Sequence, residues 1–146
     1  MALVKLAEGS YNDDPAVSDV INYITRPAQY SEIFCNNLVP GSTEDMIQQI
    51  YNCQYAYGKT SGKRIYHFII AFDDRDHLDT DLTEQLFSLL FNKYFSEYQC
   101  IAAIHRNTDN PHIHFAFNPV NIYTGLKFSR HYSFFNELQA EINTIV

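Results

Sequence analysis

Apolar residues recur along the chain with two periods, one typical of helices and one typical of strands. A first helix is predicted between the start signal Asp13-Asp14-Pro15 and the stop signal Arg26-Pro27. Aspartate caps free N–H groups, proline suits a first turn, and the residue before proline disfavours helix. The i, i+3, i+4, i+7 spacing gives this helix a buried face of Val17, Val20, Ile21 and Ile24.

Three further helices are predicted by the same period. One begins at Ser42 or Thr43 and ends near Gly58, one begins within the acidic run that ends at Asp81, and one spans residues 129–145. Their expected inward positions are Met46, Ile47, Ile50 and Tyr51; Leu82, Leu86, Leu89 and Leu90; and Phe134, Phe135, Leu138 and Ile142.

Strands are indicated where apolar and polar residues alternate. Residues 64–72 place Tyr66, Phe68, Ile70 and Phe72 on one face and His67, Ile69 and Ala71 on the other. Other strands are expected at residues 3–8, 31–35, 98–105 and 112–118. Since neither a repeat nor a linker interrupts the pattern, we expect a single α+β domain over residues 1–146. Its centre is an antiparallel β-sheet with helices packed on at least one face.

Composition narrows the class of protein. Ten basic and seventeen acidic residues give a formal charge of −7, which argues against a mainly electrostatic grip on duplex nucleic acid and leaves room for a local basic groove. No apolar run approaches the roughly 18 residues of a membrane helix, so we expect a soluble cytoplasmic protein. Cys35, Cys53 and Cys100 lack C-x-x-C spacing, which favours buried reduced thiols over a zinc site or disulfides.

Three of the six histidines, His105, His112 and His114, fall within ten residues. Turn-forming residues between the first two predict a hairpin in which His105 opposes His112 and Ala103 opposes His114. All three imidazoles then share one face and can bind a single metal ion, whereas a one-residue slip in register would separate them. Hydrogen-bonded sheet histidines are the alternative, and Asp109 is either a further ligand or, as we favour, a turn residue.

Residues 105–118 and 124–128 resemble the three-histidine motif of plasmid mobilisation relaxases, and within the HUH endonucleases they most resemble the MobA/MobP-type group. Residues 19–27 are similar to the N-terminal motif of that group, in which a Tyr-Ile pair near the end of the first helix carries the nucleophile. Tyr66-His67-Phe68 resembles its Y-H-F strand. The resemblance covers about residues 1–128.

The resemblance implies a relaxase palm that nicks one DNA strand at a plasmid transfer origin for conjugative mobilisation. Tyr23 would attack the scissile phosphate and become joined to the 5′ end, and the free 3′-OH can later reverse the step. His105, His112 and His114 would hold a divalent cation, Mg²⁺ or Mn²⁺ first, with Zn²⁺ or Ni²⁺ as alternatives because imidazole suits them. The implied partners are single-stranded origin DNA and an accessory DNA-binding protein, in a bacterial cytoplasm.

Helical geometry puts Tyr23 on the flank of the first helix's apolar stripe, from which its hydroxyl can reach the metal face. Tyr30 is the second choice of nucleophile. His67 stands where related enzymes often place an acidic residue, so we expect it to act as a base or to orient a metal ligand; a hydrogen-bonded sheet histidine is the alternative.

Six basic residues are candidates for a groove that binds single-stranded DNA, with tyrosine and phenylalanine rings stacking on unpaired bases. Ordinary solvated charge is the alternative for all six. The six candidates are Lys59, Lys63, Arg64, Arg106, Lys127 and Arg130.

Two other functions remain as alternatives to a relaxase. A rolling-circle replication initiator shares the chemistry but usually carries its tyrosine after the histidines. A non-catalytic DNA- or metal-binding module of the same fold is the second alternative.

Overall fold

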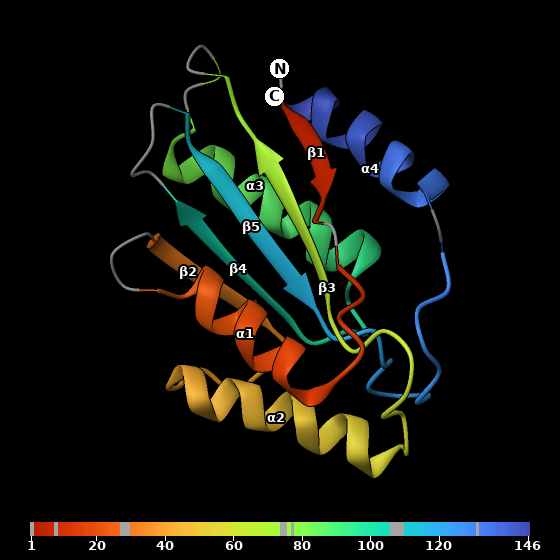
Figure 1. Cartoon of the computed structure of the whole chain (residues 1–146). Coiled ribbons are helices and arrows are strands. Elements are labelled where there is room, and N and C mark those ends of the chain that lie inside the picture. The colour runs from red at the N-terminus through yellow and green to blue at the C-terminus, as the bar shows by residue number, and fades with distance from the viewer. Residues whose placement is uncertain are drawn as a thin grey trace.

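The computed structural model describes residues 2–7, 9–26, 30–73, 76, 78–105, 110–130 and 132–146. Within these ranges, five strands form one antiparallel sheet in the order β1-β3-β5-β4-β2 (Figure 1). This architecture confirms the predicted α+β class. The strands are β1 (Leu3–Leu6), β2 (Tyr30–Asn36), β3 (Tyr66–Ala71), β4 (Cys100–His105) and β5 (His112–Phe117).

The helices begin where the capping residues predict. The Asp13 carboxylate accepts a hydrogen bond from the Ala16 N–H at the start of α1 (Asp14–Ile24). The Ser42 hydroxyl accepts one from the Asp45 N–H at the start of α2 (Thr43–Ala56). The last helix, α4 (Tyr132–Ile145), starts later than predicted, and residues 129 and 130 are not helical.

The third helix departs from the sequence prediction at its end. α3 (Thr80–Leu89) runs directly into a π-helical turn, η2 (Leu90–Tyr94), in which the Phe95 N–H donates to the Leu90 carbonyl. The wider turn lets Leu90 and Phe95 both enter the core, where each is fully buried. A 3.6-residue period gives no signal for such an insertion.

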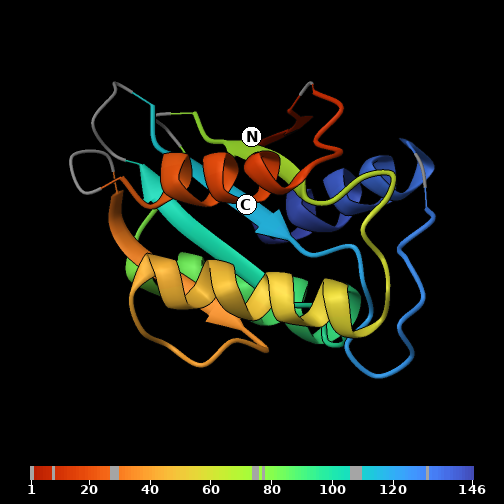
Figure 2. The ribbon, with the colours of Figure 1, turned by 60° about the horizontal axis from the view of Figure 1, so that its bottom comes forward.

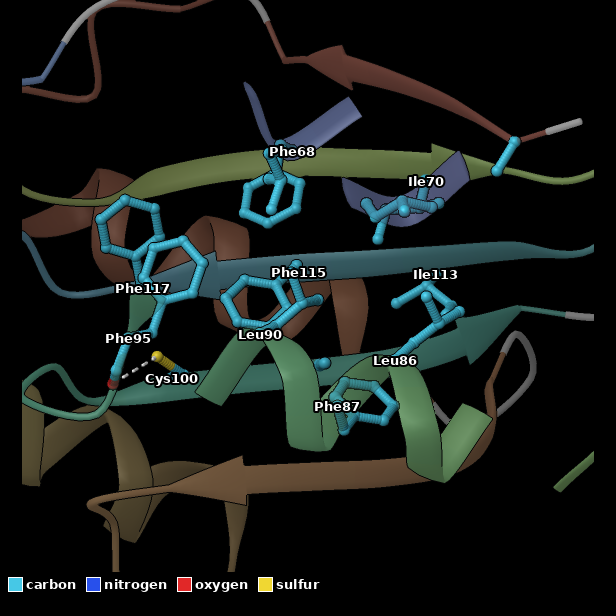
Figure 3. Packing of buried hydrophobic residues seen from close by; sticks show 14 of the residues in the cluster. Phe68, Ile70, Leu86, Phe87, Leu90, Phe95, Cys100, Ile113, Phe115 and Phe117 are labelled. Carbon is cyan, nitrogen blue, oxygen red and sulfur yellow. Dashed lines mark hydrogen bonds between the residues drawn. The ribbon is translucent and has the colours of Figure 1, made fainter. Parts of the chain in front are cut away.

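Helices cover both faces of the sheet. Figures 1 and 2 show α1 and α2 on one face and α3 and α4 on the other. The α3–α4 side is filled by stacked phenylalanines, such as Phe68 on Phe115 with ring centroids 4.7 Å apart (Figure 3). The opposite face, which the sequence pattern indicated as the polar side of β5, is partly a second core. There Ile101 and Ala116 pack beneath the apolar stripe of α1.

The remaining predictions of composition have mixed outcomes. The three cysteines are free, but only Cys100 is buried, while Cys35 and Cys53 are half-buried. Among the described residues, no helix combines the length and the apolar character needed to cross a membrane.

Candidate active site

The β4–β5 hairpin has the predicted register. His105 pairs with His112, and Ala103 pairs with His114. All three histidines therefore lie on the sheet face that α1 partly covers. His105 and His114 are buried and His112 is half-buried. The ring centroids of His105 and His114 are 4.1 Å apart, and those of His112 and His114 are 6.4 Å apart.

A fourth histidine joins this group from β3. His67 pairs with Ala116, two residues along the strand from the Ile69–His114 pair, so His67 and His114 are diagonal neighbours on the same face. The Nε2 atom of His67 lies 3.0 Å from the Nδ1 atom of His114, at hydrogen-bonding distance. We refer to His67, His105, His112 and His114 as the histidine cluster.

The helix α1 fixes the tautomer of one cluster member. The Nε2 atom of His105 is 2.9 Å from the Ile24 carbonyl oxygen, near the end of α1. Because a carbonyl can only accept, His105 donates through Nε2–H and keeps a lone pair on Nδ1. This hydrogen bond ties the C-terminal end of α1 to the end of β4.

Burial keeps two members of the cluster uncharged. Desolvation, with a smaller contribution from His105, lowers the pKa of His67 to about 4. Desolvation, followed by the charges of His105, His67 and His112, lowers the pKa of His114 to about 3. Both imidazoles are therefore neutral at neutral pH, the form in which histidine binds a metal ion.

Tyr23 lies against the cluster from α1. Its ring centroid is 5.4 Å from that of His114, 6.1 Å from that of His67 and 6.2 Å from that of His105. Tyr23 nevertheless remains 40% exposed. The flank position predicted from helical geometry is therefore observed. Tyr30 pairs with His105 through its backbone, but its side chain lies outside the described residues.

A cation beside Tyr23 was missed by the sequence analysis. The guanidinium carbon of Arg26 is 5.7 Å from the centroid of the Tyr23 ring. Arg26 follows Tyr23 by three residues and lies just beyond Thr25, the C-cap of α1. The short separation from Tyr23 was a usable signal, but the Arg26-Pro27 pair was used only to predict the end of the helix.

A buried polar network anchors the other end of α1. Arg64 donates from Nη2 to the Asp14 carboxylate at 2.5 Å and from Nε to the Gln54 side-chain oxygen at 2.6 Å. Gln54 in turn donates to the Asn118 side-chain oxygen at 3.0 Å. Arg64 is only 3% exposed, so this placement supports a structural role rather than the predicted contact with DNA.

The other basic candidates divide between two regions. Lys63 places its ammonium 5.3 Å from the Tyr11 ring and 5.0 Å from the Tyr66 ring. Lys127 donates a hydrogen bond to the Ser61 carbonyl. Burial, followed by the charges of Arg64 and Lys59, lowers the pKa of Lys127, so Lys59, Arg64 and Lys127 lie near one another. Arg130 pairs with Glu137 on α4, away from this group. Arg106 and Asp109 lie outside the described residues.

The histidine cluster fits a cation by its chemistry more than by its present ring positions. Three imidazoles lie on one sheet face, and burial keeps one of them, His114, neutral, so the group offers suitable nitrogen donors. Within the described part of the chain, however, no three histidine, cysteine or acidic side chains converge on one point. The His67–His114 and His105–Ile24 hydrogen bonds occupy one ring nitrogen of His114 and one of His105, so the other nitrogen of each ring is the one left for an ion.

A cavity of about 350 Å³ opens beside Tyr23 and His67, between α1 and the β1–β3 side of the sheet. Its lining also includes Tyr11 and Asp19, neither of which was identified from the sequence. Asp19 had a usable signal, since it precedes Tyr23 by four residues and so lies on the same helix face. Tyr11 had none, because its position depends on the segment that links β1 to α1.

An antiparallel sheet with a histidine cluster on one face and a helix-borne tyrosine against it is the arrangement of the HUH endonuclease class. Residues 23–146 match the family described as "Relaxase: MobA/VirD2-like, nuclease domain". The matched segment starts at Tyr23 and contains the whole histidine cluster. The chain belongs to this family, as its motifs predicted.

Two relatives and one solved structure extend the comparison. Two Escherichia coli proteins named Protein TraI are 28% identical over 105 residues and 20% identical over 109 residues, covering 68% and 71% of this chain. The chain spans only 14% and 15% of their lengths. A structure described as "Molecular Basis of Vancomycin Resistance Transfer in Staphylococcus aureus" shares the fold, with a TM-score of 0.63 and 14% identity. That match covers 99% of this chain and 90% of the other.

Proposed function

We propose that this domain cuts single-stranded DNA by transesterification, with Tyr23 as the nucleophile. The observation that carries the proposal is the position of the Tyr23 ring, 5.4 to 6.2 Å from three rings of the histidine cluster and still 40% exposed. Family membership supports a nuclease, and the position of the tyrosine before the histidines favours a relaxase over a rolling-circle initiator.

The reaction exchanges one phosphodiester bond for another. The Tyr23 oxygen bonds to the scissile phosphorus, the bond from phosphorus to the 3′ oxygen breaks, and the phenolic proton is passed on so that the leaving strand ends in a 3′-OH. The product is a 5′-phosphotyrosyl adduct, and attack by a 3′-OH reverses the step. A protonated phenol is a weak nucleophile, so neighbouring groups must activate it.

Charge on the phosphate is the second requirement of the reaction. His105, His112 and His114 are the residues that would hold a divalent cation, which when bound would neutralise charge on the non-bridging oxygens. Mg²⁺ or Mn²⁺ is the ion we propose first, with Zn²⁺ or Ni²⁺ as alternatives. Arg26, 5.7 Å from the Tyr23 ring, adds a fixed positive charge at the same place.

His67 acts in this proposal as a positioning residue. With a pKa of about 4 it is neutral at neutral pH and a weak proton acceptor, which disfavours the role of general base. Its Nε2 atom is instead placed to accept a hydrogen from His114 Nδ1, 3.0 Å away. That bond leaves the lone pair of His114 on Nε2, directed away from His67 and available to a cation.

The biological setting follows from the family. The substrate is proposed to be the nicking site of a plasmid transfer origin, the process conjugative mobilisation, and the partner an accessory DNA-binding protein that compensates for the net charge of −7. Because the described elements share one sheet, we propose that residues 1–146 act as a single domain.

A pool of random single strands tests the activity without knowledge of the origin sequence. The strands are incubated with the protein and Mn²⁺, and material that stays protein-linked in denaturant is recovered and sequenced. We expect a recurrent sequence at the linked 5′ end, absent with chelator and absent in Tyr23→Phe. Tyr123→Phe, which alters a tyrosine that is more exposed than Tyr23 and lies outside the histidine cluster, should behave as the parent. Absence of linked strands with every divalent ion would favour the non-catalytic module.

A further inference from the structure

The cavity beside Tyr23 has a lining that the transesterification does not use. Its volume is about 350 Å³, and small and branched apolar side chains, Ala7, Val20 and Ile69, form much of its wall. Tyr11 adds an aromatic ring and Asp19 adds a carboxylate. Tyr23 and His67 close the side next to the histidine cluster. A concave, largely apolar site with a few polar groups is typical of a ligand pocket.

Tyr11 is held in place by an unusual backbone. Its φ of +46° is uncommon for a non-glycine residue, and its carbonyl accepts a hydrogen bond from the Arg64 N–H at 2.6 Å. A Cβ atom at Gly9 would come within 2.8 Å of the ring, so the ring lies directly over that glycine. The ring is therefore a fixed wall of the cavity and is suited to stack on a flat ligand.

Asp19 is the specific polar feature of the cavity. It lies one helical turn before Tyr23 on the same face of α1, at a spacing of about 6 Å. Its side chain is exposed, and within the described part of the chain its carboxylate has no hydrogen-bond or ion-pair partner. An accessible pair of acceptor oxygens beside two aromatic rings can hold a base that offers two hydrogens.

Among the four DNA bases, guanine provides that match. Its Watson–Crick edge carries two adjacent donors, N1–H and the 2-amino group, which correspond to the two oxygens of a carboxylate. Adenine and cytosine place an acceptor next to their single amino group, and thymine places its one donor between two carbonyls. Each of these three bases therefore brings an acceptor against the carboxylate.

We propose that this cavity holds an unpaired guanine of the DNA strand, stacked against Tyr11 and bound through Asp19. The proposal rests on the proposed function only for the reason a strand is present. The base sits one helical turn from the nucleophile, so the guanine belongs to a nucleotide near the attacked phosphate. Lys63, whose ammonium is 5.3 Å from the Tyr11 ring, is the cation we expect to contact the backbone of the strand beside the cavity.

Binding without metal tests the pocket independently of cleavage. The probes are fluorescent oligothymidylates with a single central guanine, inosine, adenine or cytosine, measured by anisotropy in chelator. We expect the guanine strand to bind about tenfold more tightly than the all-thymine strand. Inosine, which lacks the 2-amino group, should lose most of this gain. Asp19→Asn should bring all strands within about twofold of one another, whereas the control Glu84→Gln on α3 should keep the preference.

The outcomes separate this proposal from the nuclease activity. Equal affinity of the parent for all strands, or an undiminished guanine preference in Asp19→Asn, overturns the pocket even if the protein nicks DNA. A guanine preference that requires Asp19 supports the pocket even if no strand is ever cut. Tyr11→Phe should retain the preference and Tyr11→Leu should weaken it; equal binding by both variants contradicts the stacking role.

Discussion

The ring of Tyr23 on α1 meets the ring of His114 on β5 edge to face, with an interplanar angle of 72°. Two features maintain this contact at opposite ends of α1. At the N-terminal end, Asp14 pairs with Arg64, and at the C-terminal end, the Ile24 carbonyl accepts from His105. The helix therefore sets the distance between the proposed nucleophile and the proposed cation site.

Replacement of His67 should weaken metal binding more than folding. His67→Ala removes the acceptor that orients His114, and loss of such an outer contact typically costs 10- to 100-fold in metal affinity, so we expect about that loss here. His67→Gln, whose amide oxygen can still accept, should recover part of it. Mn²⁺ titration followed by electron paramagnetic resonance measures this directly. Equal affinity in all three proteins would contradict the positioning role.

Acid should destabilise the fold through His67 and His114. Their pKa values are lowered in the folded state to about 4 and about 3, below the ordinary value of 6.5, so the unfolded chain binds more protons in acid. Stability is then fully present above the unfolded pKa and falls as the pH drops from about 6.5 toward 4. The slope is about 1.4 kcal/mol per pH unit for each histidine.

Urea unfolding across this pH range measures that effect. The double variant His67→Gln, His114→Gln should flatten the dependence on pH. A parent protein whose free energy of unfolding stays constant from neutral pH down to the ordinary carboxylate range would show that the two histidines are not held neutral.

Arg64 should matter for stability rather than for DNA binding. Arg64→Met removes two hydrogen bonds from a charged donor in a buried position and leaves Gln54 without one partner, which we expect to cost about 2 kcal/mol. Asp14→Asn keeps the shape and should cost less, since the carboxylate is half exposed. Thermal unfolding compares the variants. A fully stable Arg64→Met protein with impaired DNA binding would reverse the assignment.

Lys63 should contribute one phosphate contact. In Lys63→Gln, the slope of log K against log salt for an oligothymidylate should fall by about 0.7, because one fewer counterion is released from a single strand. Lys93→Gln removes a cation of η2 that is already paired with Glu141 of α4, and should leave the slope unchanged. Identical slopes in all three proteins would place the strand elsewhere.

Local patterns were enough to predict the hairpin and the histidine face. The period of two along β5 and the turn formers before it determine which residues oppose His105, and the helical period determines where Tyr23 lies. Each of these predictions depends only on residues that are close together in the sequence. The prediction that Tyr23 and the histidines share one region came from the resemblance to relaxases, since local patterns do not specify which helix lies against which strand.

Features that depend on distant contacts were not predictable in this way. Arg64 was grouped with the basic turn because the pattern did not show that Gln54 and Asp14 would enclose it. Tyr11 and Asp19 acquire meaning only when β1 and α1 come together at the cavity. The orientation of the imidazoles depends on hydrogen bonds such as that of His67 to His114, which strand geometry alone does not specify.

The most direct test of the account is to locate the covalent bond between protein and DNA. The protein is incubated with Mn²⁺ and a strand recovered from the random pool, digested with protease and nuclease, and fragmented in a mass spectrometer. The account predicts a 5′-linked nucleotide on the phenolic oxygen of Tyr23. A nucleotide on Tyr30 or another residue, or cleavage that leaves no adduct, would contradict it.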